Sequence, residues 1–222
     1  MLSQLYILPI LLFSVIIHEV SHGYAALKLG DTTARDSGRL TLNPIPHIDL
    51  VGSIIVPLFS LLVAGQIFIA WAKPVPVNPL NFSDFKRDEV IVSAVGPISN
   101  FVLAVICTAA TIGLIQIQPI IGAAAANSPF FIFLERMFFG GISLNIMLGV
   151  FNLIPIPPLD GSHVLASVLS DSAAASYSRI GFMGIFLIII LLQIPAFMAI
   201  FSAIINFFYF PLVQLVRSFA GY

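Results

Sequence analysis

The chain has 222 residues, of which 59% are hydrophobic and only 9% are charged, and its mean hydropathy is +1.07. So little charge in a chain of this length excludes an ordinary soluble domain and indicates a membrane protein. The formal net charge of −1 gives no reason to expect a nucleic-acid partner, and the one cysteine, Cys107, argues against a disulfide framework or a cysteine-built zinc site.

About five apolar stretches are long enough to cross a bilayer as helices of roughly 20 residues. The first is too long for a signal peptide and lacks a basic leader, so we expect it to be retained. We therefore predict an all-α polytopic membrane protein, forming a single membrane-embedded domain over residues 1–222. The stretches are 5–29, 90–117, 130–154, 174–192 and 196–216.

The apolar stretch 50–71 is broken by Gly52, Pro57 and Gly65. Its length would allow a crossing, and its breaks would allow a re-entrant hairpin covered by protein. Two flanking segments suggest short β-strands: 38–42 alternates apolar and polar residues, and the prolines of 73–78 deny a helix. An exposed strand edge of this kind could hold an unwound substrate by strand addition.

The first apolar stretch contains His18-Glu19-Val20-Ser21-His22. Residues four apart share one face of a helix, so the two imidazoles can bind one Zn²⁺ at ~2.0–2.1 Å. Glu19 is offset around the helix and can act as general base on a metal-activated water. Ionisable groups inside a membrane span are costly and usually functional, which strengthens this interpretation of the motif.

A zinc site of this kind needs a third protein ligand. Asp160 is the leading candidate because it is the other acid in an apolar context, and His47 and His163 are the rivals. If Asp160 meets His18 and His22, the stretches 5–29 and 130–154 must run in the same direction. That topology makes 90–117 a crossing and 50–71 a re-entrant excursion.

The basic residues support the same topology, because it puts eight of the nine on one side of the membrane. By the positive-inside rule this side is the cytoplasm. We therefore expect the N-terminus outside the cell (inner) membrane and the active site toward the cytoplasm. The eight are Lys28, Arg35, Arg39, Lys73, Lys86, Arg87, Arg179 and Arg217, and the ninth is Arg136.

Three motifs in this order resemble the site-2 protease family of intramembrane zinc metalloproteases. They are the H-E-x-x-H run, Gly96-Pro97 with Asn100, and the run from Asn152 to Gly161 with the pattern N-x-x-P-x-P-x-x-D-G. The resemblance covers roughly residues 10–170 and is that of a minimal prokaryotic member without PDZ or CBS domains. It implies one zinc ion held by His18, His22 and Asp160, with Glu19 as general base.

The resemblance also implies that Asn152 helps to hold the substrate or the developing oxyanion, and that the chain cleaves membrane-protein or signal-peptide substrates within the bilayer. His47 and His163 are left as gating or auxiliary residues, and Asn100 is interpreted first as an interhelical packing residue. Two other functions remain open: a zinc-binding membrane transporter and a catalytically silent membrane scaffold. The oligomeric state is not indicated by the sequence.

Overall fold

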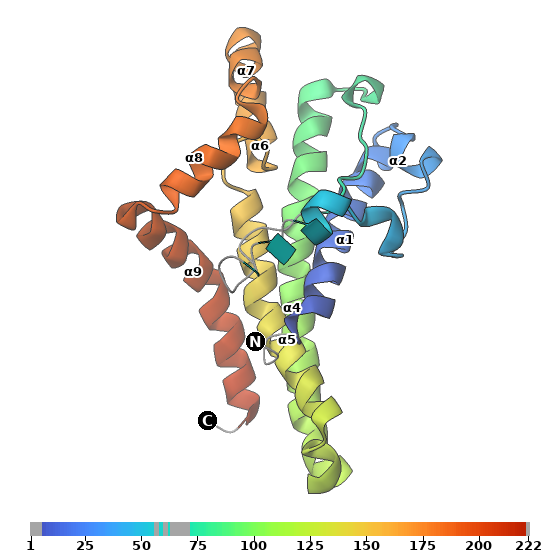
Figure 1. The fold of residues 1–222 in the computed structure, drawn as a ribbon, viewed down its shortest axis with the longest axis vertical. Helices are drawn as coiled ribbons and strands as arrows, with labels where there is room; N and C mark the ends of the chain where they lie inside the picture. The colour runs from blue at the N-terminus through green and yellow to red at the C-terminus, as the bar shows by residue number, and fades with distance from the viewer. Residues whose placement is uncertain (1–5, 56–57, 60–61, 63–71, 221–222) are drawn as a thin grey trace.

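The computed structural model describes residues 6–55, 58–59, 62 and 72–220. Within these residues the secondary structure is helical, and the long helices are α1, α4, α5 and α9 (Figure 1). The elements are α1 (Ile7–Lys28), α2 (Thr33–Asp36), η2 (Ile45–His47), η3 (Leu50–Ile55), η4 (Pro79–Asn81), α4 (Phe85–Ala126), α5 (Pro129–Asn152), α6 (Gly161–Val168), α7 (Asp171–Ser178), η5 (Gly181–Met183), α8 (Gly184–Leu191) and α9 (Pro195–Ala220).

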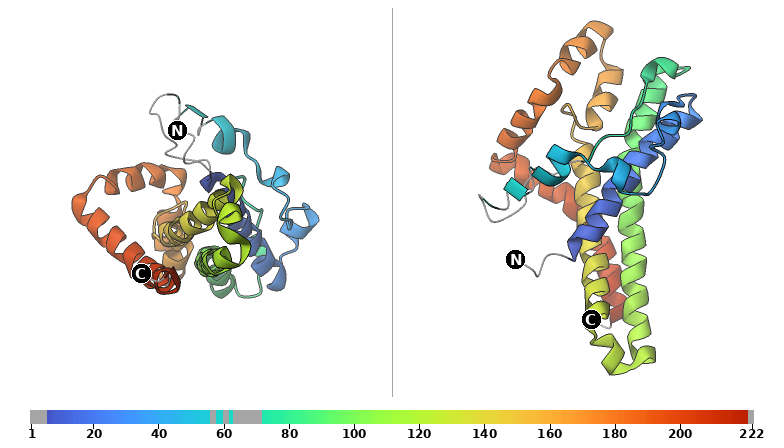
Figure 2. Two further views of the ribbon diagram at one scale, coloured as in Figure 1. Left: turned by 90° about the horizontal axis from the view of Figure 1, so that it is seen from below. Right: turned by 45° about the vertical axis from the view of Figure 1, so that its right-hand side comes forward.

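Among the described residues, α1, α4, α5 and α9 are long and apolar enough to cross a membrane. By length and composition alone, α7 and the η5–α8 segment, which meet at a bend of 66°, would count as a fifth if taken together. This confirms the polytopic helical fold. Helices α1 and α5 run in the same direction and α4 runs against them, as the topology argument requires (Figures 1 and 2).

Helix α4 is longer than expected, with 42 residues. It starts early because the side chain of Asp84 caps it, accepting a hydrogen bond from the backbone N–H of Arg87 at 3.2 Å. It also continues through 118–126, beyond the predicted span of 90–117. Alanines 123–126 favour helix strongly, and the break in this part is confined to Gly122, whose φ is +80°.

The core lies where α1, α4, α5 and α9 meet. Much of the remaining apolar surface on the outer helices stays exposed, as expected of side chains that face lipid. The buried core residues are Ile10, Ala104, Cys107, Ile142, Ile146, Val150 and Val216.

The predicted strands are wrong, because no strand occurs in 38–42 or 73–78, both of which the structure describes. The two segments do lie side by side, but a side chain joins them. One guanidinium nitrogen of Arg39, Nη2, donates to the carbonyls of Lys73 and Pro74, at 2.7 and 3.3 Å. A backbone ladder is disfavoured here because Pro74 and Pro76 have no N–H to donate.

The choice between crossing and re-entry for 50–71 falls largely outside the described residues. The flanks, however, meet: the backbone N–H of Lys73 donates to the carbonyl of His47 at 2.9 Å. A single crossing would separate these two residues by roughly 30 Å. His47 and Lys73 therefore lie side by side at one level of the molecule.

The path of the C-terminal region differs from the expectation that Arg179 and Arg217 lie on the same side of the membrane. Helices α7, α8 and α9 follow one another down one side of the bundle (Figures 1 and 2). The side chain of Gln116, in the distal half of α4, donates to the carbonyl of Phe219 at 2.8 Å. Arg217 thus lies at the opposite end from α2, and seven of the nine basic residues remain together.

Candidate metal centre

Helix α1 places both imidazoles of the H-E-x-x-H motif on one face. His18 and His22 lie one turn apart, with ring centroids 4.7 Å apart and their Nε2 atoms separated by 3.1 Å. The imidazole of His18 is buried, in a helix that is largely apolar. A helix alone therefore brings the first two nitrogen atoms together, as the motif spacing predicts.

Asp160 comes from the other side of the site, where the chain turns after the end of α5. It occupies the N-cap position of α6, but its side chain makes no capping hydrogen bond. The turn depends on Gly161, because a Cβ there would lie 2.2 Å from the carbonyl oxygen of Leu153. The Asp-Gly pair thus combines a carboxylate with the one residue type that lets α6 start so close to α5.

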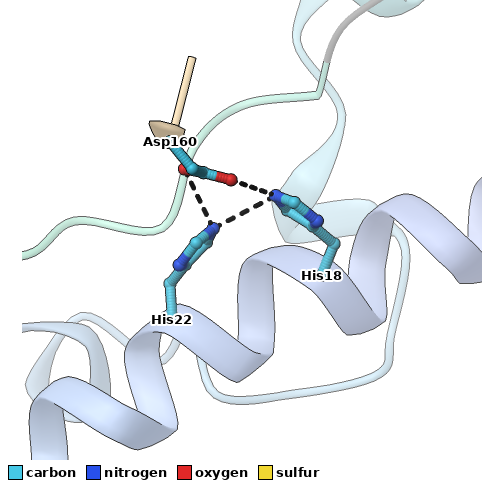
Figure 3. A group of neighbouring side chains, drawn as sticks. All are labelled: His18, His22 and Asp160. Atoms are coloured by element: carbon cyan, nitrogen blue, oxygen red, sulfur yellow. Dashed lines mark hydrogen bonds and ion pairs between the residues drawn. The ribbon is translucent and has the colours of Figure 1, made fainter. Parts of the chain in front are cut away.

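The three side chains converge on one point (Figure 3). The Asp160 carboxylate places Oδ2 3.1 Å from Nε2 of His18 and Oδ1 3.4 Å from Nε2 of His22. In a tetrahedral zinc site with bond lengths of ~2.0–2.1 Å, neighbouring donor atoms are about 3.3 Å apart. The spacing of the donor atoms therefore matches that of ligands around one ion.

The hydrogen-bond partners of the two Nδ1 atoms determine the tautomers of the rings. Nδ1 of His18 faces the side-chain oxygen of Asn100 at 2.6 Å, and Nδ1 of His22 faces the backbone oxygen of Val92 at 2.7 Å. Oxygens of this kind only accept, so each Nδ1 must carry a hydrogen, and a neutral imidazole then has its lone pair on Nε2. This arrangement is the usual support for metal-binding histidines.

These tautomers leave lone pairs facing one another across the site. Within the described residues, the buried Oδ2 of Asp160 has no hydrogen-bond partner although an imidazole nitrogen lies 3.1 Å away. Two unprotonated nitrogens and a carboxylate at this separation repel one another unless a proton or a metal cation lies between them. The donor set, its spacing and this unsatisfied oxygen all fit a zinc ion.

Glu19 projects to a neighbouring position and is oriented by the loop before α4. Its Oε2 accepts a hydrogen bond from the backbone N–H of Val75 at 2.8 Å. Val75 is buried, and the preceding carbonyls of Lys73 and Pro74 are held by Arg39. The loop therefore orients the carboxylate of Glu19. The sequence had instead suggested this segment as a strand edge that binds substrate.

The other candidate residues lie outside the converging group. His47 is buried and bonds the carbonyl of Thr41 through Nε2 at 2.9 Å. His163 pairs through Nδ1 with Oε1 of Glu89 at 2.8 Å, on the wall of a cavity of ≈ 730 Å³. The described geometry therefore favours Asp160 over both rival histidines. Asn152 donates to the carbonyl of Leu148 on its own helix at 3.0 Å.

Two residues that support the site were missed or underrated from the sequence. Gly96 packs against the imidazoles themselves: a Cβ there would lie 2.3 Å from Nε2 of His22 and 2.8 Å from Cε1 of His18. Asn145, fully buried on α5, bonds Asn100. A polar residue inside an apolar span was the available signal for Asn145, and the Gly-Pro pair for Gly96.

A family model for peptidase family M50 matches residues 83–192. The "Putative zinc metalloprotease YwhC" of Bacillus subtilis is 36% identical over 190 residues, covering 86% of this chain and 81% of the relative. The chain belongs to peptidase family M50. The resemblance to site-2 proteases is thereby confirmed, and this M50 chain is a zinc metalloendopeptidase and a multi-pass membrane protein.

Two further relatives are also named "Putative zinc metalloprotease". Rip2 of Mycolicibacterium smegmatis is 28% identical over 214 residues, covering 95% of this chain and 72% of Rip2. Rip2 of Mycobacterium tuberculosis is 30% identical over 154 residues, covering 69% of this chain and 53% of the relative. No solved structure matches the chain.

Proposed function

We propose that this M50 chain is an intramembrane endopeptidase that hydrolyses peptide bonds within membrane-spanning segments of other proteins. The observation that carries the proposal is the depth of the donor atoms. His18 lies near the middle of the 22-residue helix α1, so at ~1.5 Å per residue roughly 16 Å of helix separate it from each end. In a hydrocarbon layer of ~30 Å this depth is close to the midplane.

In this proposal His18, His22 and Asp160 hold the zinc ion through the three converging donor atoms. When bound, zinc lowers the pKa of a coordinated water toward ~7 and polarises the substrate carbonyl. Glu19, held through Oε2 by Val75, takes a proton from the attacking water and passes it to the leaving amine. Burial of His18 keeps the charged groups in a region of low dielectric, where their interactions are stronger than in water.

Asn152 is proposed to contact the substrate carbonyl. One amide hydrogen of Asn152 is engaged by Leu148, and the second is the group that would donate to the developing oxyanion. Substrates are proposed to be single-span proteins or leftover signal peptides, because a helix must be locally unwound before its carbonyls can be reached. The clustered basic residues support an orientation in the cell (inner) membrane with the N-terminus outside.

The decisive experiment compares membranes of cells that carry wild-type protein or the Glu19→Gln variant. New protein N-termini are mapped by mass spectrometry, and zinc is counted in the purified proteins. We expect both proteins to bind zinc, while the variant loses cleavage by ~10²–10⁴-fold because the base is gone. Glu135→Gln, the same change near the start of α5 and remote from the end that leads to Asp160, is the control and should cleave normally. New termini confined to soluble domains would refute an intramembrane substrate, and full cleavage by Glu19→Gln would refute the assigned base.

A further inference from the structure

A chain of side-chain amides connects His18 to the third helix of the bundle. Nδ1 of His18 donates to Oδ1 of Asn100 at 2.6 Å, and Nδ2 of Asn100 donates to Oδ1 of Asn145 at 3.1 Å. The chain ends on the backbone, where Nδ2 of Asn145 donates to the carbonyl oxygen of Gly141 at 2.9 Å. Both asparagines are fully buried.

The backbone end gives this chain a direction. The carbonyl of Gly141 can only accept, so Asn145 must present its NH₂ group to Gly141 and its oxygen to Asn100. Asn100 must then present its NH₂ group to Asn145 and its oxygen to His18. That oxygen in turn requires a hydrogen on Nδ1 of His18, and the neutral imidazole then presents an unprotonated Nε2 to the metal centre.

The packing of α5 on its neighbours makes this contact possible. Gly141 and Gly149 lie one turn before and one turn after Asn145, so the three residues share a face. A Cβ on Gly141 would lie 2.8 Å from Sγ of Cys107, and one on Gly149 would lie 3.1 Å from the ring of Phe101. Small residues at this spacing let two helices approach closely, and here they bring Asn145 within reach of α4.

Asn145 does not contact the proposed ligands or the reacting atoms. A buried amide in an apolar bundle is costly unless each polar atom is satisfied, and a leucine of similar volume would avoid that cost. We propose that Asn145 is a positioning residue, which fixes the tautomer of His18 through Asn100 so that Nε2 binds zinc. The inference rests on the proposed role of His18 as a zinc ligand.

The test measures zinc affinity by competition with a chromophoric chelator, together with the visible spectrum of the cobalt-substituted protein. Asn145→Leu should bind zinc ~10–100-fold more weakly, as is typical when the partner of a metal ligand is lost. Asn145→Asp should restore affinity, because a neutral buried carboxyl can donate to Gly141 and accept from Asn100. Thr108→Val is the control: Thr108 is equally buried on α4 but bonds the carbonyl of Ala104 on its own helix.

A merely structural role of Asn145 would change thermal stability and leave zinc affinity and the cobalt spectrum as in wild type. That result for Asn145→Leu would overturn the proposal, as would an Asn145→Asp variant that binds zinc as weakly as Asn145→Leu. A wild-type chain that binds no zinc, or a His18→Ala variant that binds it normally, would remove the proposed metal centre itself.

A second measurement does not depend on any variant of Asn145. Nitrogen-15 NMR of histidine-labelled, zinc-free wild-type protein at pH 8, with His18→Gln used to assign the signal, reports which nitrogen carries the hydrogen. We expect the Nδ1–H tautomer for His18. An Nε2–H tautomer would overturn the proposal.

Discussion

Replacing Gly96 with alanine tests the metal centre through sterics alone. The new Cβ would lie 2.3 Å from Nε2 of His22, whereas ordinary contacts begin at 3.4 Å. The imidazole must therefore move by about 1 Å, while metal–ligand distances tolerate shifts of only ~0.2 Å. The ring cannot simply swing aside, because Val92 holds its Nδ1 and Asp160 lies against its Nε2.

We expect Gly96→Ala to weaken zinc binding by at least ~100-fold, because losing a supporting contact alone costs ~10–100-fold. Chelator competition on purified protein measures this loss. Gly113→Ala is the matched control: it lies on the same helix with nothing within 4 Å of the new Cβ. Alanine favours helix over glycine by ~0.5–1 kcal/mol, so neither change should weaken α4 itself. Stoichiometric zinc at wild-type affinity in Gly96→Ala would show that the imidazoles are not the ligands in this arrangement.

Two further changes test the loop that supports the site. Val75→Pro removes the N–H that holds Glu19. Cleavage should fall by about 10-fold or more with zinc binding retained, because a hydrogen bond to a charged group contributes ~1.5–3 kcal/mol. Unchanged cleavage would mean that this contact does not orient the base. Burial alone would raise the pKa of Asp31, but hydrogen bonds from Thr33, Asn78 and Asn81 outweigh it and hold this pKa below its ordinary value. A carboxylate with a lowered pKa stabilises the fold above ~pH 4, and this stabilisation is lost as the pH falls through the folded pKa. Asp31→Asn should therefore cost ~1.5–3 kcal/mol of stability at pH 7. Melting curves of the variant and the wild type should converge in acid. A difference that stays constant with pH would contradict this assignment.

Local patterns in the chain were sufficient for the helices and for the first half of the site. A run of about 20 apolar residues has few options in a bilayer other than a helix. Within such a helix, the spacing of His18 and His22 already places both rings on one face. Asp160 was predicted as the third ligand in another way: few acidic residues lie in apolar surroundings, and the predicted topology had to bring one of them to α1.

Predictions that depended on local composition alone were less accurate where a distant contact decides the conformation. Segments 38–42 and 73–78 have strand-like patterns, but the Arg39 side chain and Glu19 take up the backbone groups that a ladder would need. The predicted span ended at residue 117, whereas helix α4 continues to Ala126. In the C-terminal region the apolar runs were recognised correctly, but their direction relative to the bundle was not.

The sequence by itself determined that this is a polytopic membrane protein, in which two imidazoles and a carboxylate share one turn of the first span. Only the tertiary structure decided that the Asp160 oxygens lie 3.1 and 3.4 Å from those imidazoles, that hydrogen bonds run from His18 through Asn100 to Asn145, and that Gly96 leaves room for both rings. The physical reason is that helical periodicity repeats every few residues and can be recognised locally. Distances between helices depend on how closely three of them pack, which the glycines and buried side chains of all three determine together.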